Sequence, residues 1–222
     1  MNNRESLKKM VVMALLSALA FFAVALLRIP MLWAGPLVLS YEPKDVIIAI
    51  GGLLFGPLPA AIIAIVVAFI EMVTVSSTGP IGFIMNVISS GCFVCSSAII
   101  YKRHRTIKGA ITGLSVACLT TTIVMLLYNY FFTPIFMGVP RAVVASLLVP
   151  LFLPFNIIKS IINAAIIMMI YKPVVTALRK SNLLIESEDS AASGKFNIGV
   201  FLLSCFVLAT AIVLVLVLQG QM

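Results

Sequence analysis

Seven apolar runs divide the chain, and short polar segments separate them. The runs lie at about residues 10–28, 46–55, 58–76, 81–101, 109–134, 147–171 and 197–218. A helix needs roughly 20 predominantly apolar residues to cross the hydrocarbon core of a bilayer, and most of the runs approach or exceed that length. The pattern therefore predicts an all-α integral membrane protein with short loops.

The composition excludes a soluble domain. Hydrophobic residues make up 62% of the 222 residues and charged residues only 10%, whereas soluble domains carry about 25% charged residues. The net charge of +8 comes from short basic clusters between apolar runs. Such clusters are typical of cytoplasmic loops, so the charge does not indicate nucleic-acid binding. The first run is longer than the apolar core of a signal peptide, and we interpret it as a retained helix.

The second and third runs could form one kinked helix over Val46–Ile70 or two passes around Phe55–Pro59. Basic clusters favour one alternative, because they accumulate in cytoplasmic loops. Two passes place the N-terminal cluster around Lys8 and the cluster Lys102–Lys108 on the same, cytoplasmic side. We therefore predict two passes, a cytoplasmic N-terminus and an extracellular C-terminus.

The order of the runs predicts three parts. Residues 1–176 form a six-helix transmembrane bundle, residues 177–195 form an acidic, serine-containing cytoplasmic linker, and residues 196–222 form an additional C-terminal transmembrane helix. This last helix is almost wholly apolar, so we interpret it as an anchor or a lipid-facing addition.

The polar residues of the apolar runs gather at one depth. With the orientation above, the outer half of the membrane contains Glu42, Asp45, Glu71, Asn86, Asn129, Asn156 and Lys159. The inner half is nearly free of such groups. Polar groups inside a bilayer are costly and usually face a cavity or one another. The asymmetry predicts a pocket open to the outside rather than a channel, which needs a polar path throughout.

Asn156 and Lys159 are the strongest candidates for ligand contacts. Their i, i+3 spacing places them on one helix face, and Asn163 continues that face one turn deeper. An asparagine can instead satisfy backbone or interhelical hydrogen bonds, and this alternative stays open for Asn86. The ammonium of Lys159 needs an acceptor or a polar ligand. Tyr41 belongs to a group of aromatic residues at the same depth, which an aromatic belt or a flat heteroaromatic ligand would explain.

The first helix carries a stripe of small residues. Ala14 and Ala18 are spaced i, i+4 in its inner half, and such a face lets another helix approach closely. A partner protein or another helix of the same bundle could occupy it, and the sequence leaves both alternatives open.

Catalytic and energy-coupling motifs are absent from the sequence. There is no G-x-x-x-x-G-K-[ST] nucleotide-binding loop and no Ser/His/Asp set, and the C-x-x-C of Cys92 and Cys95 has no further metal ligands nearby. We expect no enzymatic activity and no cofactor. Active transport would need a partner or an ion gradient.

Several motifs together resemble a known family. Gly56-Pro57-Leu58, Gly79-Pro80-Ile81-Gly82, Asn129-Tyr130 and above all Leu153-Pro154-Phe155-Asn156-Ile157-Ile158-Lys159 are similar to the riboflavin-specific S component of energy-coupling factor (ECF) vitamin transporters. The resemblance covers about residues 8–175. It implies a six-helix bundle in a bacterial cell membrane, with a substrate pocket near the outer face that the loop at about 30–44 helps to cover.

The resemblance also implies partners and residue roles. Members dock on a transmembrane coupling subunit that carries two ATPases, through small first-helix residues that correspond to Ala14 and Ala18. The residues implied to hydrogen-bond the flavin are Asn129, Asn156 and Lys159, while Asn86 and the region of Glu42 and Asp45 would line or close the site. The seventh helix departs from the family. FMN, another vitamin and a stand-alone channel or ion-coupled carrier remain alternatives; a phosphorylated ligand would need the cations Arg28, Lys44 and Arg141.

Overall fold

The computed structural model describes residues 3–34, 37–76, 78–181 and 197–220, almost entirely as helices. In chain order its elements are α1 (Asn3–Leu26), β1 (Ile29–Ala34), β2 (Leu37–Tyr41), α2 (Lys44–Phe55), α3 (Pro57–Thr74), α4 (Gly79–Arg103), α5 (Ile107–Met137), α6 (Arg141–Leu147), the π-helical turn η1 (Leu148–Phe152), α7 (Leu153–Lys180) and α9 (Ile198–Leu218). Within the described residues, six helical stretches are long and apolar enough to cross a membrane, with α6 to α7 counted as one. The predicted fold class is confirmed.

The segments α2 and α3 form a tight helical hairpin. Gly56 joins them with a φ of 94°, a conformation that glycine adopts without steric cost, and Pro57 opens the next helix. The ammonium of Lys44, at the start of α2, contacts the carboxylate of Glu71, near the end of α3. This contact excludes one kinked helix over the two segments and agrees with the prediction of two. The 12 residues of α2 span only about 18 Å, less than the hydrocarbon core.

The strands β1 and β2 pair as an antiparallel β-hairpin, which the all-α prediction did not include. β1 pairs with β2, with a register irregularity between Pro30 and Leu32, where proline has no N–H to donate. The first strand follows α1 almost directly, just beyond Arg28, where the first apolar run ends. The loop predicted at about 30–44 is thus largely built from two paired strands.

A π-helical turn interrupts the stretch from α6 to α7. It contains Pro150 and is followed at once by Pro154, and neither proline can donate a helical backbone hydrogen bond. Such turns are frequent at functional sites. α7 continues to Lys180, so the predicted boundary at 176 falls inside the helix. Residues 182–195 of the predicted linker lie outside the described residues.

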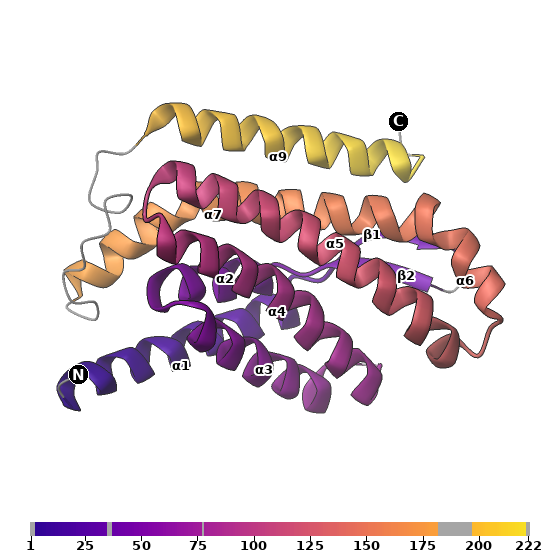
Figure 1. Cartoon of the computed structure of the whole chain (residues 1–222), viewed down its shortest axis with the longest axis horizontal. Coiled ribbons are helices and arrows are strands. Elements are labelled where there is room, and N and C mark those ends of the chain that lie inside the picture. The colour runs from indigo at the N-terminus through magenta and orange to yellow at the C-terminus, as the bar shows by residue number, and fades with distance from the viewer. Residues whose placement is uncertain (1–2, 35–36, 77, 182–196, 221–222) are drawn as a thin grey trace.

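Two apolar clusters stabilise the bundle. The larger joins α1, α2, α3, α4, α5 and α7 and contains Leu16, Ile48, Ile63, Phe93 and Ile167. The smaller joins the β-hairpin to η1, α7 and α9. Figure 1 shows α9 lying along α7, with α1 on the opposite side of the bundle. The additional C-terminal helix therefore packs on the bundle without covering α1.

The close approach of α2 to its neighbours yields a stability prediction. A Cβ at Gly52 would lie 3.0 Å from the Cβ of Ala60 and 3.3 Å from that of Ala98, whereas one at Gly91 would meet nothing within 4 Å. Gly52→Val should lower the free energy of unfolding by about 1–3 kcal/mol through overpacking. Thermal unfolding in detergent measures the loss. Gly91→Val, also inside a helix, is the matched control, and equal stability of the two variants would contradict this packing.

Candidate functional site

A cavity of about 190 Å³ lies among the β-hairpin, α3, α4, α5, η1 and α7. Five predicted site residues line it, namely Glu42, Asn86, Asn129, Asn156 and Lys159. Arg28, Glu71, Ser76, Thr78 and Ser89 add further polar groups, and Met85, Met125, Phe152 and Phe155 add apolar ones. The structure thus brings together residues that are up to 131 positions apart, from Arg28 to Lys159.

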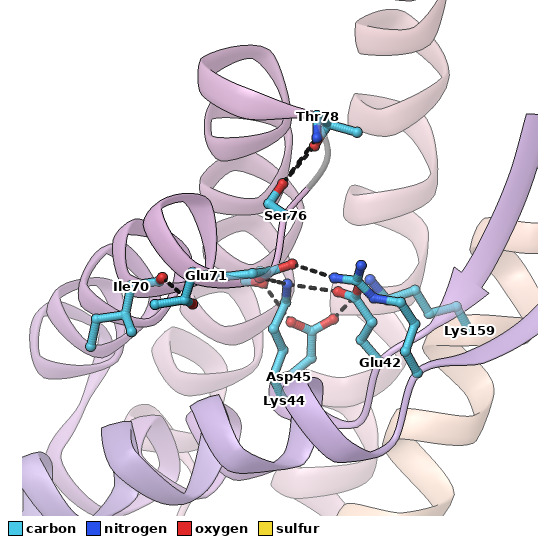
Figure 2. Close-up of polar contacts among 11 residues, drawn as sticks. Glu42, Lys44, Asp45, Ile70, Glu71, Ser76, Thr78 and Lys159 are labelled. Carbon is cyan, nitrogen blue, oxygen red and sulfur yellow. Dashed lines mark hydrogen bonds and ion pairs between the residues drawn. The ribbon is translucent and has the colours of Figure 1, made fainter.

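A network of ion pairs forms one wall of this cavity. The Lys44 ammonium donates to the carboxylates of Glu71 and, at 2.7 Å, Glu42, and the Arg28 guanidinium lies 2.9 Å from the same two carboxylates. Figure 2 shows the side chain of Lys44 reaching between those of Glu42 and Glu71. The side chains of Lys44 and Glu71 are only 1% and 2% exposed. Charges this buried are tolerated only when paired, so the network ties the base of the hairpin to α2 and α3.

A second set of contacts, on the side away from the cavity, positions Lys159. Its Nζ lies 3.1 Å from Oδ2 of Asp45, and Asp45 also accepts hydrogen bonds from Ser90 and, at 3.4 Å, Asn163. The hydroxyl of Tyr41 donates to Asn163 at 2.9 Å. Asp45 is buried and neither it nor Tyr41 lines the cavity. Both were predicted to bind substrate, and this role stays a prediction; in the structure Asp45 contacts Lys159 and Tyr41 contacts Asn163.

The charges of the two sets balance. The cations are Arg28, Lys44 and Lys159, and the carboxylates are Glu42, Asp45 and Glu71. Of the cations suggested for a phosphorylated ligand, Arg28 and Lys44 are already paired, and Arg141 does not line the cavity. In the described part of the chain, the cavity therefore offers no surplus positive charge.

Glu42 lies outside the membrane-spanning helices, at the end of the hairpin. Burial works to raise the pKa of its carboxyl, but the Lys44, Lys159 and Arg28 cations outweigh burial and hold that pKa below its ordinary value. A lowered pKa of an acid means that its ion pairs stabilise the fold above the unfolded-state pKa of about 4.3. That contribution is lost as the pH falls through the lowered value, so the carboxylate of Glu42 stays ionised near neutral pH.

The side-chain amides of Asn129 and Asn156 each donate one hydrogen bond to a backbone carbonyl four residues earlier. Nδ2 of Asn129 donates to the Met125 carbonyl, and Nδ2 of Asn156 to that of Phe152, both at 2.7 Å. Thr133 donates to Oδ1 of Asn129 at 2.8 Å. Because each amide nitrogen carries two hydrogens, these bonds orient the amides and leave each a second donor for a ligand. Local hydrogen bonding of the kind that the sequence analysis left open for Asn86 is therefore present at Asn129 and Asn156.

A second, apolar compartment of about 120 Å³ adjoins the first and shares Met85, Asn129 and Phe152 with it. The rings of Tyr128 and Phe132, which line it, stack with centroids 4.8 Å apart. The two volumes together reach the lower end of the range of about 300–1,000 Å³ that is usual for small-molecule sites. The arrangement suits a ligand with a flat apolar part and a polar part.

The stripe of small residues on α1 faces away from the bundle. Ala14 and Ala18 are exposed, while Val12, Leu16 and Ala20 are buried. Internal packing therefore does not account for the stripe, and the face remains available to another protein or to lipid.

The sequence analysis did not predict the roles of three residues in the ion-pair network. Arg28 and Lys44 were suggested only for a phosphate, and Glu71 was assigned to the polar cluster without a partner. Their pairing joins segments 27 and 43 positions apart. The signal available in the sequence was the equal number of cations and carboxylates at one depth.

Comparisons with known proteins agree with this geometry. The family model described as "ECF transporter, substrate-specific component" matches residues 8–171. The chain is 29% identical to the riboflavin transporter RibU of Staphylococcus aureus (strain TCH60), over 80% of this chain and 96% of the relative. It is 27% identical to the riboflavin transporter FmnP of Bacillus subtilis (strain 168), over 79% of this chain and 98% of the relative.

A solved structure shows the same architecture. It is described as "Structure and mechanism of the S component of a bacterial ECF transporter" and matches with a TM-score of 0.66 and 28% sequence identity. The match covers 78% of this chain and 99% of the solved chain. The family model ends at residue 171, so α9 lies beyond it.

The buried network yields a second stability prediction. Glu71→Gln leaves the Lys44 ammonium with one carboxylate fewer in a site that is 1% exposed. Removal of one partner from a buried ion pair costs about 3 kcal/mol or more, so the unfolding temperature in detergent should fall markedly. Glu5→Gln, at an exposed position of α1, is the control and should leave that temperature unchanged. A Glu71→Gln variant as stable as the control would mean that the network does not stabilise the fold.

Proposed function

Because this chain belongs to the family of ECF transporter substrate-specific components, we propose that it captures riboflavin at the outer face of a bacterial cell membrane. The resemblance first noted in the sequence is confirmed by this family match, and the chain is a transport subunit rather than an enzyme. That the substrate is riboflavin, and that an ECF module with two ATPases drives its uptake, are parts of the proposal.

The observation that carries the choice of ligand is the charge-balanced cavity beside an aromatic compartment. Riboflavin is uncharged near neutral pH and combines a flat tricyclic ring with a polyhydroxylated chain. Three cations paired with three carboxylates suit a neutral ligand that offers many hydrogen-bonding groups. The names of the two curated relatives, both riboflavin transporters, support the same choice.

We assign ring recognition to three residues. The Lys159 ammonium and the second amide hydrogens of Asn129 and Asn156 would donate to carbonyl and ring-nitrogen acceptors of the isoalloxazine. All three side chains line the polar compartment, and Asn129 also lines the apolar one. Hydrogen bonds from charged donors are worth about 1.5–3 kcal/mol, so Lys159 should contribute most. Asn86 and Glu42 complete the wall.

FMN is the second candidate within the same family. Its phosphate carries about two negative charges and would have to compete with Glu42 or Glu71 for Arg28 or Lys44, which those carboxylates already hold. A stand-alone channel is disfavoured by the apolar cluster that fills the bundle beyond the cavity, where Ile48, Ile63 and Ile167 are fully buried.

The exposed small-residue face of α1 supports the proposed partner. Close helix packing in membranes uses small residues, and Ala14 and Ala18 are exposed positions of α1. Figure 1 shows α1 on the side of the bundle opposite α9. We place the transmembrane coupling subunit there. In this orientation the N-terminus is cytoplasmic and the cavity opens outward.

Riboflavin binding tests the ligand and the site. Purified protein should quench riboflavin fluorescence in a titration, and Lys159→Ala should weaken binding roughly 10- to 100-fold, which corresponds to the loss of a charged hydrogen bond. Lys180→Ala, at an exposed position of the same helix, should bind like the unaltered protein. FMN should bind at least about tenfold more weakly than riboflavin.

The possible failures are distinct. No quenching at micromolar riboflavin by the unaltered protein would sink the ligand assignment. Binding that survives Lys159→Ala unchanged would leave riboflavin as the ligand but remove Lys159 from the site. Tighter binding of FMN would favour the second candidate.

Uptake in cells tests the partner surface. Ala14→Trp places a large ring on the exposed face of α1 and should abolish riboflavin uptake in cells that contain the ECF module, with riboflavin binding by the purified variant intact. Ala209→Trp, at an exposed position of α9, is the matched control and should support normal uptake. Normal uptake by the Ala14→Trp variant would move the docking surface elsewhere.

A further inference from the structure

The end of α9 is hydrogen-bonded to the β-hairpin. Gln219, immediately after the last residue of α9, donates from Nε2 to the carbonyl oxygen of Met31 at 2.8 Å and lies 3.3 Å from that of Pro30. Both carbonyls belong to β1, next to the irregularity in the β1–β2 register. The side chain of Gln219 thus bonds to β1 where the pairing of the two strands is irregular, 188 positions earlier in the sequence.

Apolar packing reinforces this contact. Ala211 of α9 is 6% exposed and belongs to the same buried cluster as Met31 and Leu32 of β1. Leu208 and Val215, one turn to either side of Ala211, pack against this cluster. This part of α9 therefore packs on a cluster that it shares with the hairpin, η1 and α7, while much of its remaining surface is exposed.

The hairpin connects α9 to the cavity. β1 contacts α9, whereas Val38, Leu39 and Ser40 of β2 line the cavity. A movement of the hairpin away from the cavity would have to break the contacts between β1 and α9 or carry α9 with it.

We propose that α9 is an intramolecular tether that holds the hairpin over the cavity and slows the exchange of ligand, with Gln219 and Ala211 as its positioning residues. The part that concerns exchange rests on the proposed function, whereas the restraint on the hairpin does not. Since the family model ends at residue 171, the tether is an addition to the matched bundle. In this proposal α9, which the sequence analysis interpreted as an anchor or a lipid-facing addition, restrains the hairpin beside the cavity.

Hydrogen exchange of the ligand-free full chain tests the restraint directly, because backbone amides exchange when their segment opens. Gln219→Leu removes the donor, and Ala211→Phe forces a ring into the buried cluster that α9 shares with β1 and α7. Both should speed exchange of the amides in β1 about 2- to 10-fold, the range that the loss of one hydrogen bond corresponds to. Thr210→Val and Ala209→Phe, both at exposed positions of α9, are the matched controls and should leave that exchange unchanged.

Release of riboflavin tests the consequence. Dissociation followed by the recovery of flavin fluorescence should be about 2- to 10-fold faster in Gln219→Leu and Ala211→Phe than in the two controls. Because Gln219 and Ala211 do not line the cavity, the absorption spectrum of the bound flavin should stay the same in all variants.

The outcomes separate the two proposals. Unaltered β1 exchange in Gln219→Leu and Ala211→Phe would overturn the tether, whether or not the chain binds riboflavin. Faster β1 exchange with an unchanged release rate would overturn its role in ligand exchange. Absence of riboflavin binding by the unaltered chain would overturn the proposed function alone, since the exchange experiment needs no ligand. If the Ala211→Phe variant does not fold, the comparison of Gln219→Leu with the control Thr210→Val decides whether the tether exists.

Discussion

The buried ammonium of Lys44 constrains much of the end of the molecule that holds the cavity. An ammonium that is 1% exposed among apolar helices is stable only with carboxylates at hand, and two segments supply them, the end of the β-hairpin through Glu42 and the end of α3 through Glu71. Pairing thus fixes three chain segments against one another. It also fixes the direction of the next residue, Asp45, whose carboxylate enters the bundle and holds Lys159 at the edge of the cavity. The position of the best ligand-contact candidate follows from a structural ion pair.

The sequence predicted the depth of the site but not its internal order. Tracking basic clusters through the loops placed Glu42, Asn86, Asn129, Asn156 and Lys159 at one level, and the structure brings all five to one cavity. The sequence does not show which side chains near the start of α2 face the cavity and which face the helices. That depends on contacts with α3, α4 and α7. Tyr41 and Asp45 therefore lie behind the wall. The segment of the β-hairpin was predicted only as a covering loop, because the pairing of two strands this short depends on contacts that the sequence pattern does not show.

The bundle keeps its two proposed contacts apart. The exposed stripe of α1 and the tethering helix α9 lie on opposite sides (Figure 1), and the large apolar cluster between them is built from buried aliphatic and aromatic side chains. A partner on α1 would consequently not touch the hairpin through α9. Docking and the rate of ligand exchange could then be changed by mutation independently of each other.

The equality of cations and carboxylates around the cavity has an electrical consequence. Each elementary charge moved across a membrane does work of about 2.3 kcal/mol for every 100 mV of transmembrane potential. The three positive and three negative groups of the site have no net charge, and an uncharged ligand such as the proposed riboflavin would add none. The transmembrane potential would therefore exert no net force on the paired groups and the ligand taken together.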